Sequence, residues 1–341
     1  NTALRAEIKA TKPFLRTSEF LWQEGHTVHS TKEEAEQEVI KILDIYKNTV
    51  EEELAIPVTT GKKSEKEKFV GAEYTTTMES IMPDGKALQM GTSHFLAQNF
   101  SKPFEVKFAD KDNVEHFAWQ TSWGVSWRLI GAMIMAHGDD KGLVLPPKVA
   151  PMQVVIVPIY KNDNDKENVI TKVNEIANIL ELKNIRIHID SREELTPGYK
   201  FNDWELKGVP LRIEIGPKDI ENQNMVLAKR YNHEKMKMGL NEVEKIVTIL
   251  DEIQTEMLKK AKTEAADNTI DIENYDEFKM KMEKGGFFNS PWCGKLDCEE
   301  KIKEETGAEI RVIPFNSENT SKKCIYCKQQ STSVPIFARG Y

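Results

Sequence analysis

Two arginines and several carboxylates stand close together near the start of the chain, in Arg5-Ala6-Glu7 and in PFLRTSEFLWQEGHT at 13–27. Guanidinium groups pair with phosphate oxygens through parallel hydrogen bonds, and a carboxylate accepts a hydrogen bond from an adenine amino group. Arg5, Glu7 and Arg16 are therefore candidates for binding a nucleoside triphosphate. A ladder of ion pairs on an edge strand would use the same residues, and charge alone does not separate these interpretations.

The four cysteines form a second group that could do chemistry. They occur as Cys293-x4-Cys298 and Cys324-x2-Cys327. Two short paired spacings in one small region are typical of a tetrahedral Zn²⁺ site with thiolate ligands, and a reducing compartment disfavours disulfides. Reduced thiols without a metal are the alternative. Four thiolates leave no coordination position for water, so the predicted zinc is structural rather than catalytic.

Composition limits the class of protein. The chain has 341 residues, 30% of them charged, with a net charge of -8, which argues against a surface coated in positive charge for indiscriminate nucleic-acid binding. No run approaches the ~18 to 20 apolar residues of a membrane span, and no signal-peptide pattern follows Asn1. We expect a cytoplasmic protein of two or three domains with no membrane partner.

The elements that must position the first group lie in residues 1–151. Ser30 and Glu33 have the spacing of a capping box, and an apolar helical stripe follows. The stripe consists of Val39, Ile42, Leu43, Tyr46 and Val50. Aromatic and apolar runs predict strands of a largely antiparallel sheet at 14–22, 74–81 and 104–108, and a buried helix at 129–137.

From residue 152 the pattern changes to strands that alternate with helices. QVVIVPI, IRIHID, LRIEI and VLAKRY predict strands, and helices are expected over 165–182, up to Leu206, and over 241–263. Such alternation buries both faces of a mixed sheet, so residues 152–265 are predicted to form an α/β domain. The polar segment 265–271 is expected to link this domain to a small α+β zinc domain, 266–341.

Longer strings place the chain in a known family. PFLRTSEFLWQEGHT resembles motif 2 of the prolyl-tRNA synthetases, in particular the archaeal and eukaryotic type with a C-terminal extension. EKEKFVGAEYTTTMES, QMGTSHFLAQNFSKPFE, QTSWGVSWRLIGAMIMAHGDD, KGLVLPP and PGYKFNDWELKGVPLRIEIGP follow in the family's order, so the resemblance covers effectively the whole chain. It implies a class II catalytic core with an antiparallel sheet (1–151), an anticodon-binding domain (152–265) and the zinc-binding extension (266–341).

The resemblance implies an ATP site in the core. Arg5 resembles the arginine that holds the α-phosphate and the amino acid's carboxylate. Phe20 resembles the ring that stacks on adenine, with core packing as the alternative. Arg128 resembles the motif 3 arginine that faces adenine and the γ-phosphate, whereas Trp127, where the family often has threonine, is expected to pack away from ATP. The implied ATP-binding residues are Arg5, Glu7, Arg16, Thr17, Phe20, Gln89, Thr92, Ser126 and Arg128.

The resemblance also implies a proline pocket, which must be small and apolar to hold a pyrrolidine ring. Trp22 and Phe69 resemble its walls, and Arg5 and His94 its polar contacts. Each aromatic residue could instead belong to a core, and His94 could be a structural histidine. The string QMGTSH, which contains Gln89, Thr92 and His94, is interpreted as a loop that contacts ribose and proline.

The implied reaction has two steps. Proline's carboxylate attacks the α-phosphate of ATP to give prolyl-adenylate and pyrophosphate, and the terminal ribose hydroxyl of tRNA(Pro) then takes the prolyl group. Catalysis is positioning and charge neutralisation by Arg5, Arg16, Arg128 and Mg²⁺. The cofactors are thus ATP, Mg²⁺ and structural Zn²⁺, and the substrates are L-proline and tRNA(Pro).

Five charged residues of 152–265 lie in the segment that resembles the family's anticodon-binding region. A mixture of Arg, Lys and Glu suits the edges of splayed guanines, and a solvated charged face is the alternative for each residue. The candidates are Arg192, Lys200, Glu205, Lys207 and Arg212. In the ending FARGY, the resemblance implies that the carboxylate of Tyr341 folds back near the active site, where a frayed tail would otherwise be expected.

Motif 1 of the family, which builds its dimer interface, corresponds to sequence upstream of Asn1, as does the loop that grips proline's imino group. We expect the intact enzyme to be a homodimer through that upstream segment. The main alternative is a non-catalytic, synthetase-like tRNA-binding protein, against which the retained ATP-site residues speak. No inserted domain is visible between Thr27 and Gly124, so editing in cis is not expected.

Overall fold

The computed structural model describes residues 1–6, 10–317 and 321–341. They form two compact units, one of residues 1–52, 56–132 and 262–341, the other of residues 53–55 and 133–261. Along the chain the units are connected through helices α2 (Arg128–His137) and α6 (Ile246–Asp267).

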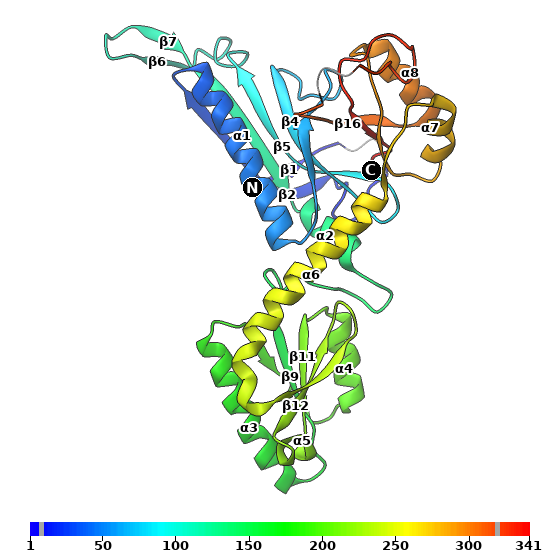
Figure 1. The fold of residues 1–341 in the computed structure, drawn as a ribbon. Coiled ribbons are helices and arrows are strands. Elements are labelled where there is room, and N and C mark those ends of the chain that lie inside the picture. The colour runs from blue at the N-terminus through cyan, green and yellow to red at the C-terminus, as the bar shows by residue number, and fades with distance from the viewer. Residues whose placement is uncertain (7–9, 318–320) are drawn as a thin grey trace. The chain divides into compact units, whose positions relative to one another are not determined.

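One ten-stranded sheet runs through the first unit (Figure 1). The strand order is β1-β2-β8-β5-β4-β3-β16-β17-β15-β14, and each neighbouring pair is antiparallel except β14 and β15, which are parallel. In that order the strands span Thr2–Leu4, Glu19–His29, Trp119–Ser126, Ala87–Ala97, Tyr74–Ile81, Thr59–Lys62, Glu309–Pro314, Ile336–Ala338, Phe287–Asn289 and Thr269–Asp271. The prediction of a largely antiparallel core sheet is confirmed.

Helix α1 (Lys32–Asn48) packs across β4, β5 and β8, and a π-helical turn, Thr49–Glu53, continues it. Its buried side chains, Ala35, Val39, Leu43 and Tyr46, follow the predicted stripe. The capping box is one residue later than predicted, because Thr31 is the N-cap and Glu34 its partner. Ser30 still contributes, since its hydroxyl donates to Glu34 Oε2 at 2.8 Å.

Several predicted boundaries are wrong. The first long strand begins at Glu19 rather than Phe14, which has φ 60° in the preceding turn. The strand predicted at 104–108 is β6 (Lys107–Ala109), one arm of a hairpin with β7 (Glu115–Phe117). QMGTSH, interpreted as a loop, lies in the central strand β5, where a register shift between Met78 and Glu79 on β4 interrupts the pairing.

The C-terminal segment joins the same sheet through β16, which pairs with β3. The close approach requires glycine at position 61, because a Cβ there would stand 2.2 Å from the backbone oxygen of Ile313. The predicted linker at 265–271 is wrong, since α6 continues to Asp267 and Thr269–Asp271 forms β14. Helices α7 (Tyr275–Met282) and α8 (Leu296–Thr306) complete this segment around a core that includes the fully buried rings of Phe278, Phe288 and Phe337.

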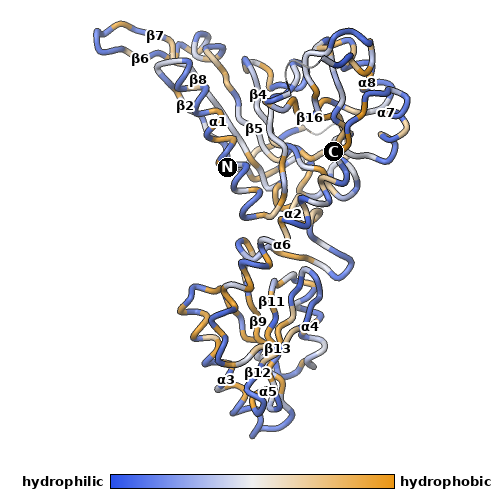
Figure 2. Tube along the Cα trace, viewed as in Figure 1, coloured by the Kyte–Doolittle hydropathy of each residue, from blue (hydrophilic) through white to orange (hydrophobic). Residues whose placement is uncertain are grey.

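The second unit contains a five-stranded mixed sheet in the order β10-β9-β11-β12-β13. Strands β10, β9 and β11 are parallel, and β12 and β13 are antiparallel to their neighbours. The predicted mixed sheet is confirmed, and β13 is a strand that was not predicted. Hydrophobic residues follow β9 and β11 (Figure 2), and Val154, Ile156, Leu211 and Ile213 are fully buried. In that order the strands span Ile187–Ile189, Val154–Pro158, Leu211–Ile215, Asn224–Lys229 and Lys235–Gly239.

Helices cover this sheet, including α3 (Asp163–Leu182), α4 (Pro197–Leu206) and α5 (Pro217–Glu221). The predicted helix at 241–263 begins as a 3-10 turn, Leu240–Lys245, and continues as α6. Throughout the part of the chain that the structure describes, no helix combines the length and apolar character that a membrane span needs.

Candidate active site

A cleft of about 590 Å³ opens on the sheet of the first unit. Side chains from β2, β4, β5 and β8, from the segment before β2, and from the first residue of α2 line it. Antiparallel pairing brings these segments together, because Trp22 is the register partner of Ser126 and Thr92 that of Gly124. Residues that are far apart in the sequence thus share one concave surface.

Each predicted ATP- or proline-binding residue that the structure describes lines this cleft. These residues are Arg5, Arg16, Thr17, Phe20, Trp22, Phe69, Gln89, Thr92, His94, Ser126 and Arg128. Glu7 lies outside the described residues. The structure brings the predicted residues together, whereas the individual roles of these residues stay predictions.

The guanidinium of Arg5 lies 4.9 Å from the centre of the Phe20 ring, a cation–π contact. Phe20 in turn meets Trp22 edge-on, with the ring centres 5.8 Å apart. Among residues 1–6, 10–317 and 321–341, no carboxylate lies within ion-pair distance of Arg5. Because the Arg5 guanidinium lies over one face of the Phe20 ring, a base that stacks on Phe20 would take the opposite face.

Arg128 is held at the start of α2 by backbone carbonyls rather than by acids. Its Nε donates to the Leu15 oxygen at 3.0 Å and its Nη1 to the Gln89 oxygen at 3.3 Å. Burial lowers the pKa of Arg128, and the negative charge of Glu79 partly offsets this effect. No carboxylate of the described residues lies within ion-pair distance of the Arg128 guanidinium. Because Arg128 lines the cleft at the N-terminus of α2, its charge and the helix dipole would both stabilise an anion there.

The end of the chain reaches the same cleft. Arg16 Nη2 donates to the backbone oxygen of Tyr341 at 3.4 Å, and the Tyr341 hydroxyl donates to Asp84. The ammonium groups of Lys12 and Lys86 lie 5.1 and 5.2 Å from the Tyr341 ring centre. Tyr341 is therefore anchored near the cleft, in agreement with the prediction that it folds back.

Aromatic rings and threonine hydroxyls surround His94 in the cleft. The centre of the Phe69 ring lies 4.9 Å from the centre of the His94 ring and 6.4 Å from the centre of the Phe100 ring. His94 Nδ1 is 2.9 Å from Thr75 Oγ1, and Nε2 is 3.0 Å from Thr92 Oγ1. Burial, with a smaller effect of the charge of His26, lowers the pKa of His94 to about 4, so the ring is neutral at pH 7.

A buried charge network at the edge of the cleft was not predicted from the sequence. Lys63, which lines the cleft, donates to Glu79 Oε1 at 2.7 Å and to the Arg311 backbone oxygen at 3.0 Å. Burial alone would raise the pKa of Glu79, but Lys63 and Arg311 more than offset it, so the pKa lies below its usual value. The sequence did contain a signal for this network, which is the glutamate inside the predicted strand TTTMES. A carboxylate buried in a strand requires a cationic partner.

Trp127 departs from its predicted placement. Although it was expected to pack away from ATP, it lines the cleft, and its indole meets Phe14 edge-on with ring centres 5.7 Å apart. Its Nε1 is buried, and the structure gives it no hydrogen-bond partner.

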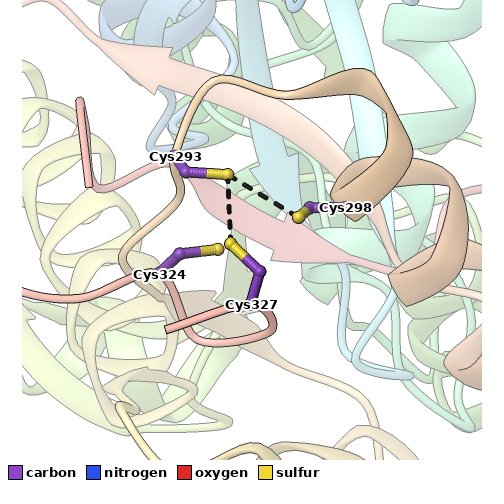
Figure 3. Close-up of side chains that lie close together, drawn as sticks. All are labelled: Cys293, Cys298, Cys324 and Cys327. Carbon is purple, nitrogen blue, oxygen red and sulfur yellow. Dashed lines mark hydrogen bonds between the residues drawn. The ribbon is translucent and has the colours of Figure 1, made fainter. Parts of the chain in front are cut away.

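The four cysteines meet in the C-terminal segment of the first unit, and their sulfur atoms point toward one another (Figure 3). All four Sγ atoms lie within 4.8 Å of one another, and Cys293 Sγ is 3.6 Å from those of Cys298 and Cys327. Tetrahedral zinc with ~2.3 Å bonds to sulfur needs sulfur atoms roughly 3.8 Å apart. The donor set and spacing therefore fit the predicted structural Zn²⁺.

Three of the predicted anticodon residues, Arg192, Lys200 and Lys207, lie around Asp190, which is fully buried. Arg192 Nη2 pairs with Asp190 at 2.7 Å and with Asp203 at 2.8 Å, and Lys207 also pairs with Asp203, at 3.0 Å. Trp204 Nε1 donates to Asp190 at 2.8 Å, and the Lys207 ammonium lies 4.4 Å from a Trp204 ring centre.

Lys200 is not placed to read a base. Its side chain is 5% exposed, and its ammonium donates to the Asp190 backbone oxygen at 3.1 Å. Glu205 and Arg212 instead line a pocket of about 190 Å³ together with Trp204, His233 and Lys235. Within that pocket Glu205 contacts His233 at 3.1 Å, and Arg212 pairs with Glu214 at 2.8 Å.

Three family models match the chain in this order. They are described as "tRNA synthetase class II core domain (G, H, P, S and T)" for residues 1–137, "Anticodon binding domain" for 153–249, and "Prolyl-tRNA synthetase, C-terminal" for 275–341. The proline–tRNA ligase of Cenarchaeum symbiosum is 63% identical over 345 residues, covering 100% of this chain and 71% of the relative.

The chain belongs to the prolyl-tRNA synthetase family. Proline–tRNA ligase 2 of Clostridioides difficile is 52% identical over 335 residues, covering 98% of this chain and 69% of that protein. Crystal structures of the Cryptosporidium parvum prolyl-tRNA synthetase, one with halofuginone and AMPPNP and one with L-proline and AMP, superpose with a TM-score of 0.96. They are 43% identical and cover 100% of this chain and 72% of that chain. The predicted family and fold class are confirmed.

Proposed function

We propose that Arg5, Arg16 and Arg128 hold the triphosphate of ATP in the cleft of the first unit while proline's carboxylate attacks the α-phosphate. The enzyme is a proline–tRNA ligase, which activates L-proline with ATP and transfers it to tRNA(Pro). That activity makes the non-catalytic alternative wrong.

The arrangement of Arg5 and Arg128 carries this proposal. Both guanidinium groups line the cleft, and neither has a carboxylate among the described residues within ion-pair distance. One is held against the Phe20 ring and the other by two carbonyl oxygens. Two fixed cations in one partly buried space favour a polyanionic ligand, since their positive charges otherwise repel each other.

Proline would lie beside Phe69, His94 and Trp22. The C. parvum structures contain L-proline with AMP, and an ATP analogue with halofuginone, which supports a common cleft for amino acid and nucleotide. A neutral His94 suits this role, because it adds no charge to an apolar wall. Phe20 would stack on adenine, and Gln89, Thr17 and Ser126 would donate to or accept from the ribose and phosphates. Thr92 would contact the ribose or proline.

The residues would act by positioning and by electrostatic stabilisation rather than by covalent catalysis. Arg5 would pair with both the α-phosphate and the proline carboxylate, so that the two reacting groups are held in line. Arg128 would take charge that develops on the leaving pyrophosphate. Mg²⁺, when bound, would neutralise phosphate oxygens, and Glu24 and Glu67 line the cleft with carboxylates that suit it.

The remaining roles concern the partners of the enzyme. The second unit would bind the anticodon of tRNA(Pro) through exposed side chains such as Lys207 and the pocket at Arg212. The cysteine cluster would bind structural Zn²⁺. We further propose that the enzyme works in the cytoplasm as a homodimer, as the resemblance implies.

ATP–pyrophosphate exchange tests the assignment. Wild-type protein should exchange with proline alone among the twenty amino acids. Arg5→Ala should abolish exchange and Arg5→Lys should restore little, because an ammonium cannot pair with two oxygens of phosphate and carboxylate in the guanidinium geometry. Near-normal exchange by a folded Arg5→Ala protein would refute the role of Arg5.

A further inference from the structure

Three side chains on β4 and β5 form a continuous line of hydrogen bonds into the cleft. Thr75 and His94 are register partners across the two strands. The Phe69 N–H donates to Thr75 Oγ1 at 2.9 Å, Thr75 Oγ1 lies 2.9 Å from His94 Nδ1, and His94 Nε2 lies 3.0 Å from Thr92 Oγ1. The side chain of Thr75 is buried, with 1% of the residue exposed.

The hydrogens of this line can be assigned. Thr75 Oγ1 accepts from Phe69, and within the described residues the only other partner of its hydroxyl is His94 Nδ1. If Nδ1 carried the hydrogen, the Thr75 hydroxyl hydrogen would be buried without an acceptor, which is unfavourable. Nδ1 therefore accepts from Thr75, and Nε2 carries the hydrogen.

The tautomer of His94 determines what Thr92 can offer a ligand. When Nε2 carries the hydrogen, Thr92 Oγ1 accepts it, and the Thr92 hydroxyl keeps its own hydrogen. Thr92 lines the cleft, and its hydroxyl has no second partner among the described side chains. In the opposite tautomer Thr92 would donate to Nε2 and present only lone pairs to the cleft.

We propose that Thr75 is a positioning residue that fixes the Nε2–H tautomer of His94 and thereby makes the Thr92 hydroxyl a donor to an oxygen of the bound proline or its adenylate. The same hydroxyl holds the Phe69 backbone, so Thr75 also sets the 4.9 Å separation of the Phe69 and His94 rings. This inference rests on the proposed placement of proline beside these rings.

Thr75 and its neighbour provide matched variants. Thr75→Val removes the hydroxyl at nearly constant volume, and Thr75→Ser keeps it. Thr76→Val is the control, because Thr76 is fully buried at the next position of the same strand and its hydroxyl donates to the Ser93 backbone oxygen, at 2.8 Å. Thermal unfolding of the whole protein should show similar losses for Thr75→Val and Thr76→Val.

The kinetic readout is proline-dependent pyrophosphate exchange. Loss of the fixed hydrogen-bond donor to the substrate predicts a rise of about fivefold in the KM for proline with Thr75→Val, and a change of less than about threefold in kcat. Thr75→Ser and Thr76→Val should stay within about twofold of wild type. A Thr75→Val protein with the same KM as Thr76→Val overturns the proposal.

The tautomer is measured independently of activity, by ¹⁵N chemical shifts of His94 at pH 7. Nε2 should be the protonated nitrogen in wild type and in Thr75→Ser, and the two tautomers should exchange in Thr75→Val. A wild-type ring protonated at Nδ1, or at both nitrogens, overturns the proposal. A wild-type protein without proline-dependent exchange would instead contradict the proposed function, and the ¹⁵N shifts would still decide the tautomer.

Discussion

Arg311, from the C-terminal segment, donates through Nε and Nη2 to one carboxylate oxygen of Glu79, at 3.1 and 3.0 Å, inside the sheet that carries the cleft. Glu79 is fully buried, and its other oxygen accepts from Lys63 and from the Thr77 hydroxyl. The Glu79 carboxylate thus joins Lys63, which lines the cleft, to Arg311. Arg311 lies 232 positions after Glu79 in the sequence.

We predict that Arg311→Met lowers the free energy of unfolding by about 2–4 kcal/mol, because the buried Glu79 carboxylate loses two charge-assisted hydrogen bonds and keeps Lys63 as its cationic partner. Urea unfolding at pH 7 measures this. Glu309→Gln is the control, since Glu309 also pairs with Arg311, at 2.9 Å, but is 23% exposed and should cost about 1 kcal/mol or less. A loss below about 1 kcal/mol for Arg311→Met would contradict the prediction.

The same network gives stability a pH dependence with a defined sign. Because the pKa of Glu79 is lower in the folded state than the ordinary 4.5, its contribution is present above pH 4.5 and is lost as the pH falls through the folded value. The stability difference between wild type and Glu79→Gln should therefore shrink in acid. If the stability advantage of wild type over Glu79→Gln grew below pH 4.5, Glu79 would not be the ionised partner of Lys63 and Arg311.

We predict that Arg128→Lys lowers kcat/KM for ATP about 100-fold or more, because a lysine cannot bond the Leu15 and Gln89 oxygens and still face a phosphate. Exchange kinetics at varied ATP measure this. Arg339→Lys is the matched control, since Arg339 Nε also donates to a backbone oxygen, that of Thr306 at 2.9 Å. Equal losses in both variants would show a general effect of replacing arginine.

The sequence predicted well where a local pattern determines the result. Alternation of strands and helices predicted the mixed sheet of the second unit, and two short cysteine spacings predicted the cluster. It failed where the partner is remote. Nothing near Thr269 shows that this polar segment pairs with β15, and nothing near Glu79 identifies Arg311. The resemblance to family motifs identified the cleft residues but placed His94 on a loop, because a motif does not show which strands pair with each other or in what register.

We predict that His94 makes stability fall in mild acid. The pKa of His94 is about 4 in the folded protein and 6.5 as the ordinary value. As the pH falls from 6.5 to 4, His94 therefore binds a proton in the unfolded state before it does so in the folded state, which lowers the free energy of unfolding. Above pH 6.5 His94 is neutral in both states and has no such effect. His94→Gln should remove part of this slope in urea unfolding. An unchanged slope in His94→Gln would contradict the burial of His94.

Lys200 and Lys207 should separate folding from tRNA binding. Lys200→Met should cost about 1–3 kcal/mol of stability, because it removes the buried donor to Asp190. Lys207→Met should change stability by less than about 0.5 kcal/mol, since its side chain is 47% exposed, but should raise the KM for tRNA. A stable Lys200→Met protein with weakened tRNA binding would restore Lys200 as a base-reading residue.

Removal of the predicted zinc should affect both stability and activity. The purified protein should contain one zinc per chain, and Cys293→Ser or Cys324→Ser should reduce this content strongly, because hydroxyls are poor zinc ligands compared with thiolates. The chain has only these four cysteines, so metal released by a thiol reagent comes from one cluster. Metal analysis during titration with the reagent measures the stoichiometry.

The reason that activity should also fall is the shared sheet. The cluster packs with Phe278 and Phe337 in the core beneath β16, and β16 carries Arg311 to Glu79 and pairs with β3. Loss of metal should therefore lower the midpoint of thermal unfolding and reduce proline-dependent exchange, and restored Zn²⁺ should recover both. A metal-free protein with unchanged stability and exchange would show that the thiols alone hold this core together.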